Sequence, residues 1–311
     1  MRIAICEDSQ LDRELLVDVV GHYAAQRSRA IQVTAYDGGL GLVRDMEDGG
    51  YYDLVFLDNL MDDMLGIQVA RRLREVKREE DIHFTVVNGE NASGVGLTPR
   101  QARGMYDAGA DVITLGNHTW NRIQIADFLD KDPYILRPAN YAGRVPGRGF
   151  GMFDGPRGLR IGVMNLMGRL ELNSNLDSPF KAANQLLQGT EARRCDLVLV
   201  DFHAEATSEK GALAWYLDGR VQALWGTHTH VPTADGQILP KGTGFLTDLG
   251  MTGPRRSVLG IKPELSMNLF LGGLPRRYEE AEGPCKLNAC RFTIDTESGR
   301  CVQVRRVDLE E

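Results

Sequence analysis

The chain alternates short apolar runs with amphipathic segments of helical length. An apolar run at residues 2–6 precedes a helical pattern that begins at Leu11, and a second apolar run follows at residues 31–35. Apolar runs of this length indicate strands, whereas apolar residues spaced by three or four positions indicate a helix. The order predicts strand–helix–strand units, and therefore an α/β fold with a central mixed sheet flanked by helices.

The same alternation continues along the rest of the chain. Further strands are expected at residues 54–57, 84–87, 112–115, 161–165, 197–201 and 223–225. Helices are expected near residues 40–46 and 65–76, from Pro99 onward, and at residues 123–129 and 208–217. In the first helix Leu15, Val19 and Tyr23 share an apolar face. Near the C-terminus, strands at residues 291–294 and 302–307 flank a hairpin turn.

Length and composition are those of a soluble globular protein. The chain has 311 residues, and no apolar run approaches the roughly 20 residues of a membrane helix. Its formal net charge of −7 argues against a broad nucleic-acid surface but leaves small phosphorylated substrates open. Met1 leads directly into an apolar strand without the basic segment of a signal peptide, and the five cysteines are scattered. We therefore expect reduced thiols, no membrane partner and a cytoplasmic location.

Residues 1–82 resemble the receiver domain of two-component response regulators, as a truncated βαβαβα segment. The resemblance rests on Glu7 and Asp8 after the first strand and on Asp58 after the third. In that family these carboxylates bind Mg²⁺ and the last accepts a phosphoryl group. Here Asp62 replaces the usual Pro, and the pattern stops before the later Ser/Thr and Lys. A working phosphoswitch is not expected, and helix capping is the simpler role for the acidic pair.

Four segments place metal-ligand side chains directly after apolar strands. They are Asn88-Gly89-Glu90-Asn91, Gly116-Asn117-His118, Asp201-Phe202-His203 and Gly226-Thr227-His228-Thr229-His230. Side chains at strand ends meet at one edge of an α/β sheet, and four of the 6 histidines fall in these segments. A lone histidine near a strand is usually an ordinary hydrogen-bonded residue, but this concentration favours a shared metal site.

Imidazole, carboxylate and amide oxygen together suit transition metals. A bridging carboxylate lets two cations lie roughly 3.5–4 Å apart, where they activate water and neutralise phosphate. We expect two divalent or mixed-valence ions, Fe or Mn first, with Zn or Mg as alternatives. His118 is the expected proton donor to a leaving alkoxide, because the ordinary pKa of histidine lies near working pH.

Six segments carry a closer resemblance. They are Asn88-Gly89-Glu90-Asn91-Ala92, Gly116-Asn117-His118-Thr119-Trp120, Arg137-Pro138-Ala139-Asn140, the run from Asp201 to Lys210, Gly226-Thr227-His228-Thr229-His230-Val231, and the run from Thr247 to Pro254. Through them residues 83–311 resemble the bacterial YmdB-type metallophosphoesterases, a branch of the calcineurin-like superfamily. The resemblance implies a di-metal phosphodiesterase for small phosphodiesters, cyclic nucleotides such as 2′,3′-cAMP among them. Assembly into a homo-oligomer stays open.

The resemblance also implies a role for each ligand. Matching position makes Glu90 the carboxylate that bridges the two metals and His118 the general acid. The other expected ligands are Asn91 and His230 for one metal, and Asn117, His203 and His228 for the second.

The chain departs from this family at its start, where the family has a strand followed by an Asp ligand in a Gly-Asp-Val-Val-Gly loop. Asp58 also follows a strand, and the helix and strand after it repeat the family's order up to Glu90. We expect Asp58 to replace the missing metal ligand, with Asp8 as the alternative. The expected domains are therefore residues 1–82, which lend the Asp58 strand and the following helix to the catalytic sheet, and residues 83–311.

Two other functions stay open from the sequence. The chain could be a signalling fusion in which the receiver-like segment regulates the phosphodiesterase, or a metal-poor, inactive scaffold without the usual first Asp ligand. Around the site, Glu205, Ser208 and Lys210 could line the substrate cleft, with helix capping as the alternative role.

Overall fold

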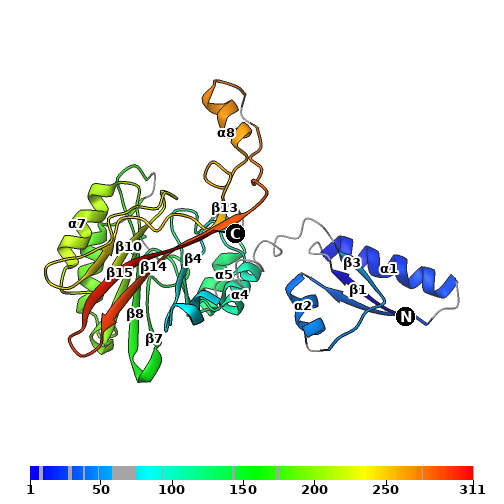
Figure 1. Ribbon diagram of the computed structural model, residues 1–311, viewed down its shortest axis with the longest axis horizontal. Helices are drawn as coiled ribbons and strands as arrows, with labels where there is room; N and C mark the ends of the chain where they lie inside the picture. Colours follow the sequence, from blue (N-terminus) through cyan, green and yellow to red (C-terminus); the bar gives the residue numbers. More distant parts are fainter. Residues whose placement is uncertain are drawn as a thin grey trace. The chain divides into compact units, whose positions relative to one another are not determined.

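The computed structural model describes residues 1–6, 10–26, 30–37, 39–47, 49–57, 75–92, 94–141, 144–172, 175–274 and 276–310 (Figure 1). It divides into two compact units. The first is Met1–Asp81 with Arg100–Gly109, and the second is Ile82–Pro99 with Ala110–Glu311. The functional division expected between residues 82 and 83 stays a prediction.

The first unit contains a three-stranded parallel sheet. Its elements are β1 (Arg2–Cys6), α1 (Gln10–Gln26), β2 (Gln32–Tyr36), α2 (Gly39–Glu47) and β3 (Leu54–Leu57). The strands lie in the order β2-β1-β3. Helix α4 (Pro99–Ala108) belongs to this unit except for Pro99.

Leu15, Val19 and Tyr23 were expected to form the apolar face of α1, but this face is exposed. Leu15 and Val19 are 60% and 57% exposed, whereas Val20 is 7% exposed and packs against Ile3 and Ile5. Apolar residues occupy adjacent sides of this helix, so spacing alone does not decide which side meets the sheet. Glu7, Asp8, Asp58 and most of the helix expected at residues 65–76 lie outside the described residues, and the receiver resemblance stays a prediction.

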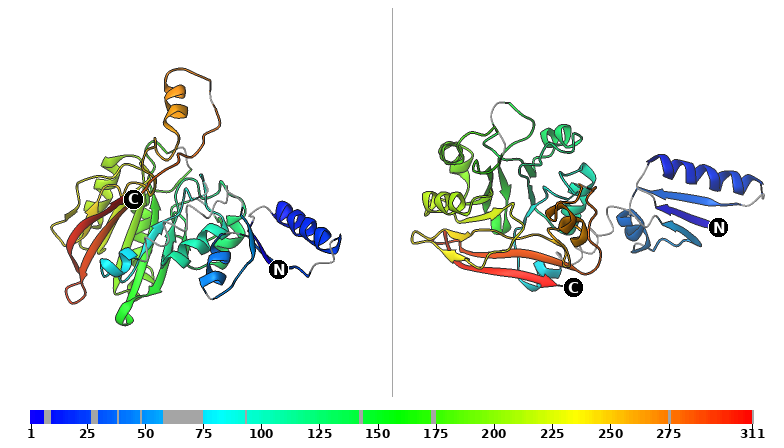
Figure 2. Two further views of the ribbon diagram at one scale, coloured as in Figure 1. Left: turned by 45° about the vertical axis from the view of Figure 1, so that its right-hand side comes forward. Right: turned by 90° about the horizontal axis from the view of Figure 1, so that it is seen from above.

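The second unit is built on a six-stranded mixed sheet (Figure 2). The strand order is β11 (Gln237–Ile238), β12 (Gly244–Leu246), β10 (Ala223–Thr227), β9 (Leu197–His203), β8 (Arg160–Met167) and β7 (Phe150–Asp154). The four inner strands are parallel to one another, and the two edge strands are antiparallel to their neighbours. The predicted mixed α/β fold is therefore confirmed.

Helices and a hairpin cover opposite faces of this sheet. Helices α6 (Pro179–Gln188) and α7 (Thr207–Leu217) lie on the face that contains Leu224 of β10. On the other face Trp225 stacks at 5.9 Å on Phe292 of β14 (Cys285–Asp295), which pairs with β15 (Arg300–Glu310) and with the short β13 (Gly253–Pro254). Consecutive strand residues point to opposite faces, so both layers bury apolar residues of one strand.

A second parallel sheet adjoins β8. It consists of β4 (Val86–Asn88), β5 (Val112–Thr114) and β6 (Ile135–Leu136), with α5 (Ile125–Lys131) before β6. The buried Asn165 of β8 donates its two amide hydrogens to the carbonyls of Leu115 and Leu136, at 2.7 and 2.8 Å. These bonds link the ends of β5 and β6 to the central sheet.

Several strands differ in length from the prediction. β9 continues to His203, β10 to Thr227, and the terminal hairpin strands are longer than expected. The remaining elements are the short helical turns Pro156–Gly158 and Ala192–Arg194 and the helix α8 (Pro263–Phe270). Over the residues that the structure describes, no helix has both the length and the apolar character to cross a membrane.

Candidate metal centre

All but one of the predicted site residues lie at strand ends of the second unit. They are Glu90 and Asn91 after β4, Asn117 and His118 after β5, His203 at the end of β9, and His228 and His230 after β10. The exception is Asp58, which lies outside the described residues. Hydrogen bonds and close contacts join these seven side chains into two groups.

His203 is the centre of the first group. Its side chain is 1% exposed, and its Nε2 lies 2.7 Å from Oε2 of Glu90. The same nitrogen is 2.8 Å from Oδ1 of Asn117 and 3.1 Å from Nδ1 of His228. These are the residues that were expected to bind one metal, together with the expected bridging carboxylate.

The other nitrogen of His203 is held by Thr227. The Thr227 hydroxyl donates to Oδ1 of Asp201 at 2.8 Å, so its oxygen is left to accept from Nδ1 of His203 at 3.1 Å. Nδ1 therefore carries the ring proton and Nε2 carries a lone pair in the neutral ring. A histidine whose second nitrogen is fixed in this way has the tautomer that binds a metal through Nε2.

Glu90 is buried and charged. Its side chain is 1% exposed, and Oε1 accepts the backbone N–H of His118 at 2.5 Å. Burial acts to raise the pKa of Glu90, but His203 and the His118 N–H lower it below its ordinary value. Residue 116 is glycine because a Cβ there would collide with both Glu90 Oε2 and His203 Nε2.

Asn91 joins the second group. Its Nδ2 lies 3.0 Å from Nε2 of His230, and its Oδ1 accepts from Nδ1 of His118 at 2.9 Å. Asn91 and His230, which were expected to share the other metal, are thus in contact. The amide oxygen faces His118, so ligation through Oδ1 beside His230 requires a half-turn of the amide.

A buried carboxylate under the site was given no role from the sequence. Asp201 is 0% exposed and accepts hydrogen bonds from Thr114 at 2.5 Å, Thr227 at 2.8 Å and Asn88 at 3.2 Å. Burial raises the pKa of Asp201, and the two hydroxyls oppose this effect. The available signal was a threonine at the last position of each of two apolar strands, β5 and β10. Asp201 ties the ends of β4, β5 and β10 to β9.

Residues 63–307 match the family described as YmdB-like protein. The chain belongs to the YmdB-like family. The match covers all seven described site residues and begins ahead of the boundary that was expected at residue 83. The YmdB-type part of the predicted resemblance is therefore confirmed.

Relatives agree with this family. A 2′,3′-cyclic-nucleotide 2′-phosphodiesterase of Bacillus subtilis (strain 168) is 43% identical over 244 residues, 78% of this chain and 91% of that protein. A hypothetical protein from Thermus thermophilus has a crystal structure that matches with a TM-score of 0.73 and 39% identity, over 79% of this chain and 94% of that one. A novel phosphatase from Mycoplasma pneumoniae matches with a TM-score of 0.73 and 34% identity, over 79% and 89%. The prediction of an enzyme that hydrolyses phosphoric diesters is confirmed.

The donor atoms of this YmdB-like site are of the kinds that bind a cation. Glu90 Oε2 and His230 Nδ1 are buried and have no hydrogen-bond partner within the described part of the chain. In that same part, no group of three His, Cys, Asp or Glu side chains is arranged to hold a metal ion as it stands. His203 Nε2 lies 2.7 Å from Glu90 Oε2 and 2.8 Å from Asn117 Oδ1, and these atoms need a positive charge between them, either a proton on the imidazole or a metal ion.

The cleft residues proposed from the sequence differ in position. Glu205 is 47% exposed on its side chain, and its carboxylate lies 3.1 Å from Nε2 of His228, while Ser208 is exposed. Lys210 is 0% exposed and donates to Oδ2 of Asp248 at 2.6 Å. The interpretation that Lys210 lines the cleft is therefore wrong. Its neighbour Glu209 is also buried and accepts backbone N–H groups of the loop after β8.

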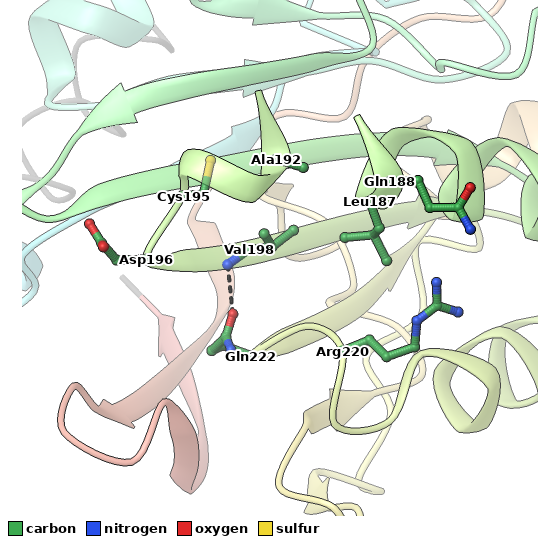
Figure 3. A pocket seen from close by; sticks show the side chains of 8 residues that line it. All are labelled: Leu187, Gln188, Ala192, Cys195, Asp196, Val198, Arg220 and Gln222. Carbon is green, nitrogen blue, oxygen red and sulfur yellow. Dashed lines mark hydrogen bonds between the residues drawn. The ribbon is translucent and has the colours of Figure 1, made fainter. Parts of the chain in front are cut away.

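A separate surface hollow of about 310 Å³ lies at the start of β9 (Figure 3). Its lining includes Cys195, Val198, Arg220 and Gln222, and the Gln222 side chain accepts from the Val198 N–H. Strands β9 and β10 begin here and end at His203 and Thr227. The hollow therefore lies at the opposite ends of these two strands, and none of the seven described site residues lines it.

Proposed function

We propose that the chain hydrolyses cyclic phosphodiesters of the 2′,3′-cyclic nucleotide class with two metal ions. The observation that carries the proposal is the convergence of Glu90 Oε2, Asn117 Oδ1 and His228 Nδ1 on Nε2 of His203. The name of the B. subtilis relative, at 43% identity, supports the substrate class. The donors are nitrogen and oxygen atoms without thiolate, a set that suits Fe, Mn or Zn.

The proposed ligands follow the two contact groups. Glu90 would be shared between the metals, with Asp58 completing the set. The other ligands would be Asn117, His203 and His228 for one ion, and Asn91 and His230 for the second. When bound, two such cations activate water and offset the charge of the phosphate.

His118 would transfer the proton to the departing oxygen. Its Nδ1 lies 2.9 Å from Oδ1 of Asn91, and after the half-turn that ligation by Asn91 requires, the amide Nδ2 would donate to Nδ1 and leave the ring proton on Nε2 for transfer. Its side chain is 32% exposed, which permits contact with a substrate. Its backbone N–H is bound to Glu90, which keeps the imidazole beside the proposed bridging carboxylate.

The test combines metal analysis with hydrolysis. Purified protein should contain about two Fe or Mn per chain and hydrolyse both bis(p-nitrophenyl) phosphate and 2′,3′-cAMP. Chelation should abolish both activities, and Mn²⁺ should restore them. A His203→Ala preparation, purified in parallel, controls for contaminating enzymes. A chain that retains fewer than one metal and turns over neither substrate would instead be the inactive scaffold.

A further inference from the structure

The loop from His228 to His230 has two non-glycine residues with positive φ, a backbone conformation that strains residues with a Cβ. His228 has φ 106° and His230 has φ 64°, both in the left-handed region. Non-glycine residues persist there only where surrounding contacts impose the conformation. Both residues are proposed metal ligands, so the contacts that impose this shape also set the position of two ligands.

Asp248 contacts the middle of this loop at Thr229 and the chain just after it at Thr233. Its Oδ2 accepts the N–H of Thr229, which lies between the two histidines, at 3.2 Å. Its backbone exchanges hydrogen bonds with Thr233, whose N–H donates to the Asp248 carbonyl at 3.1 Å and whose hydroxyl accepts the Asp248 N–H at 2.9 Å. The carboxylate is 1% exposed, so its charge needs a partner inside the protein.

Lys210 is that partner, and it comes from a different element. Its ammonium donates to the same Oδ2 that accepts from Thr229, at 2.6 Å, and its side chain is 0% exposed. Its aliphatic stem packs against Gly226 near the end of β10. A Cβ added at Gly226 would lie 2.8 Å from Lys210 Cδ and would also overlap the Thr247 carbonyl, so only glycine fits there. Lys210 thus connects the first turn of α7, the end of β10 and the loop after β12.

We propose that Lys210 is a positioning residue that holds the His228–His230 loop, through Asp248, in the shape that binds metal. The inference rests on the proposed function, because the loop bears two of the proposed ligands. Lys210 is too deeply buried to contact a substrate, and its ammonium hydrogen-bonds to Asp248. Without the Lys210 ammonium, the Asp248 carboxylate loses the ion pair that orients it. Its Oδ2 is then no longer held where it accepts from the N–H of Thr229, and the loop loses that hydrogen bond.

The test compares Lys210→Met with Asp218→Asn. Asp218 is also buried, accepts the N–H groups of Lys241 and Thr243, and lies at the far end of α7. In metal-free protein, Lys210→Met should speed amide exchange of Thr229 at least tenfold, and Mn²⁺ affinity should fall at least tenfold. Asp218→Asn should lower the melting temperature and change neither quantity. The double variant Lys210→Met/Asp248→Asn removes the unpaired charge, keeps an oxygen for Thr229, and should recover part of the protection.

A Lys210→Met protein with wild-type Thr229 exchange and wild-type Mn²⁺ affinity would overturn the proposal, even if it melts earlier. Should Lys210→Met not fold, Asp248→Ala, which removes the oxygen that accepts from Thr229, takes its place with the same two readouts, and unchanged values there would overturn the proposal equally. Wild-type protein that binds no Mn²⁺ would defeat the proposed function. The Thr229 exchange of metal-free protein would still decide whether Lys210 holds the loop.

Discussion

Nδ1 of His203 lies 3.1 Å from Oγ1 of Thr227, and this contact fixes which nitrogen of the imidazole is free. The Thr227 hydroxyl hydrogen is already given to Asp201, so the threonine oxygen can only accept. A residue that is not itself a proposed ligand therefore prepares one.

We expect Thr227→Val to lower Mn²⁺ affinity roughly 10- to 100-fold, because the ring of His203 is no longer held in one tautomer. Isothermal titration of metal-free protein measures this. Thr243→Val is the matched control, because Thr243 is also buried and its hydroxyl donates to the Val221 carbonyl at 2.6 Å. Both variants should lose about 1 kcal/mol of stability. Equal Mn²⁺ affinities in the two would contradict the tautomer argument.

His228→Ala should lower metal content and turnover together. Its Nδ1 is one of the donors around His203, and no neighbouring side chain replaces it. We expect loss of about one metal per chain and at least a roughly 100-fold drop in turnover. His22→Ala, in α1 of the first unit, is the control. Full activity with unchanged metal in His228→Ala would remove His228 from the site.

His118→Asn should separate substrates by leaving group. Proton donation matters most for a poor leaving group, so hydrolysis of 2′,3′-cAMP should slow by roughly 100-fold or more, and that of bis(p-nitrophenyl) phosphate far less. Metal content should match wild type, because His118 is not a proposed ligand. Equal slowing of the two substrates would count against the general-acid role.

Acid should destabilise the metal-free protein through His228. Burial and the nearby His203 lower the pKa of His228 to about 4, from an ordinary 6.5. The unfolded chain therefore binds this proton first, and the free energy of unfolding falls as pH drops from about 6.5 to about 4. The ring is partly exposed, so we expect a loss of about 1–2 kcal/mol. Urea unfolding in EDTA should show a steeper decline for wild type than for His228→Asn, and parallel curves would disprove this.

Asp58 is the proposed replacement for the first Asp ligand of the family. If it is the missing ligand, Asp58→Asn should lose about one metal and most activity, whereas Asp8→Asn should keep both. Metal analysis of the two variants distinguishes them. Unchanged metal in Asp58→Asn, together with labelling of the wild-type Asp58 by a small acyl phosphate, would favour the receiver interpretation.

The sequence alone determined the strands that carry the candidate ligands and the side chains that gather at their ends, but not β6, β7, α6, β11, β12, β13 or α8. Both follow from local information. Apolar spacing fixes the type of an element, and a ligand directly after a strand is carried to the sheet edge by the strand itself. Glu90, His203 and His228 could therefore be grouped before their contacts were known.

Only the tertiary structure decided which contacts each side chain makes. Spacing did not show that α1 buries Val20 rather than Val19, that Lys210 turns inward to Asp248, or that Thr227 fixes His203. A buried charge or hydroxyl takes whichever partner the packed chain brings within about 3 Å, and that partner is usually distant in sequence. The physical reason is that burial makes an unpaired polar group costly, so its role is set by the packing around it and not by its neighbours along the chain.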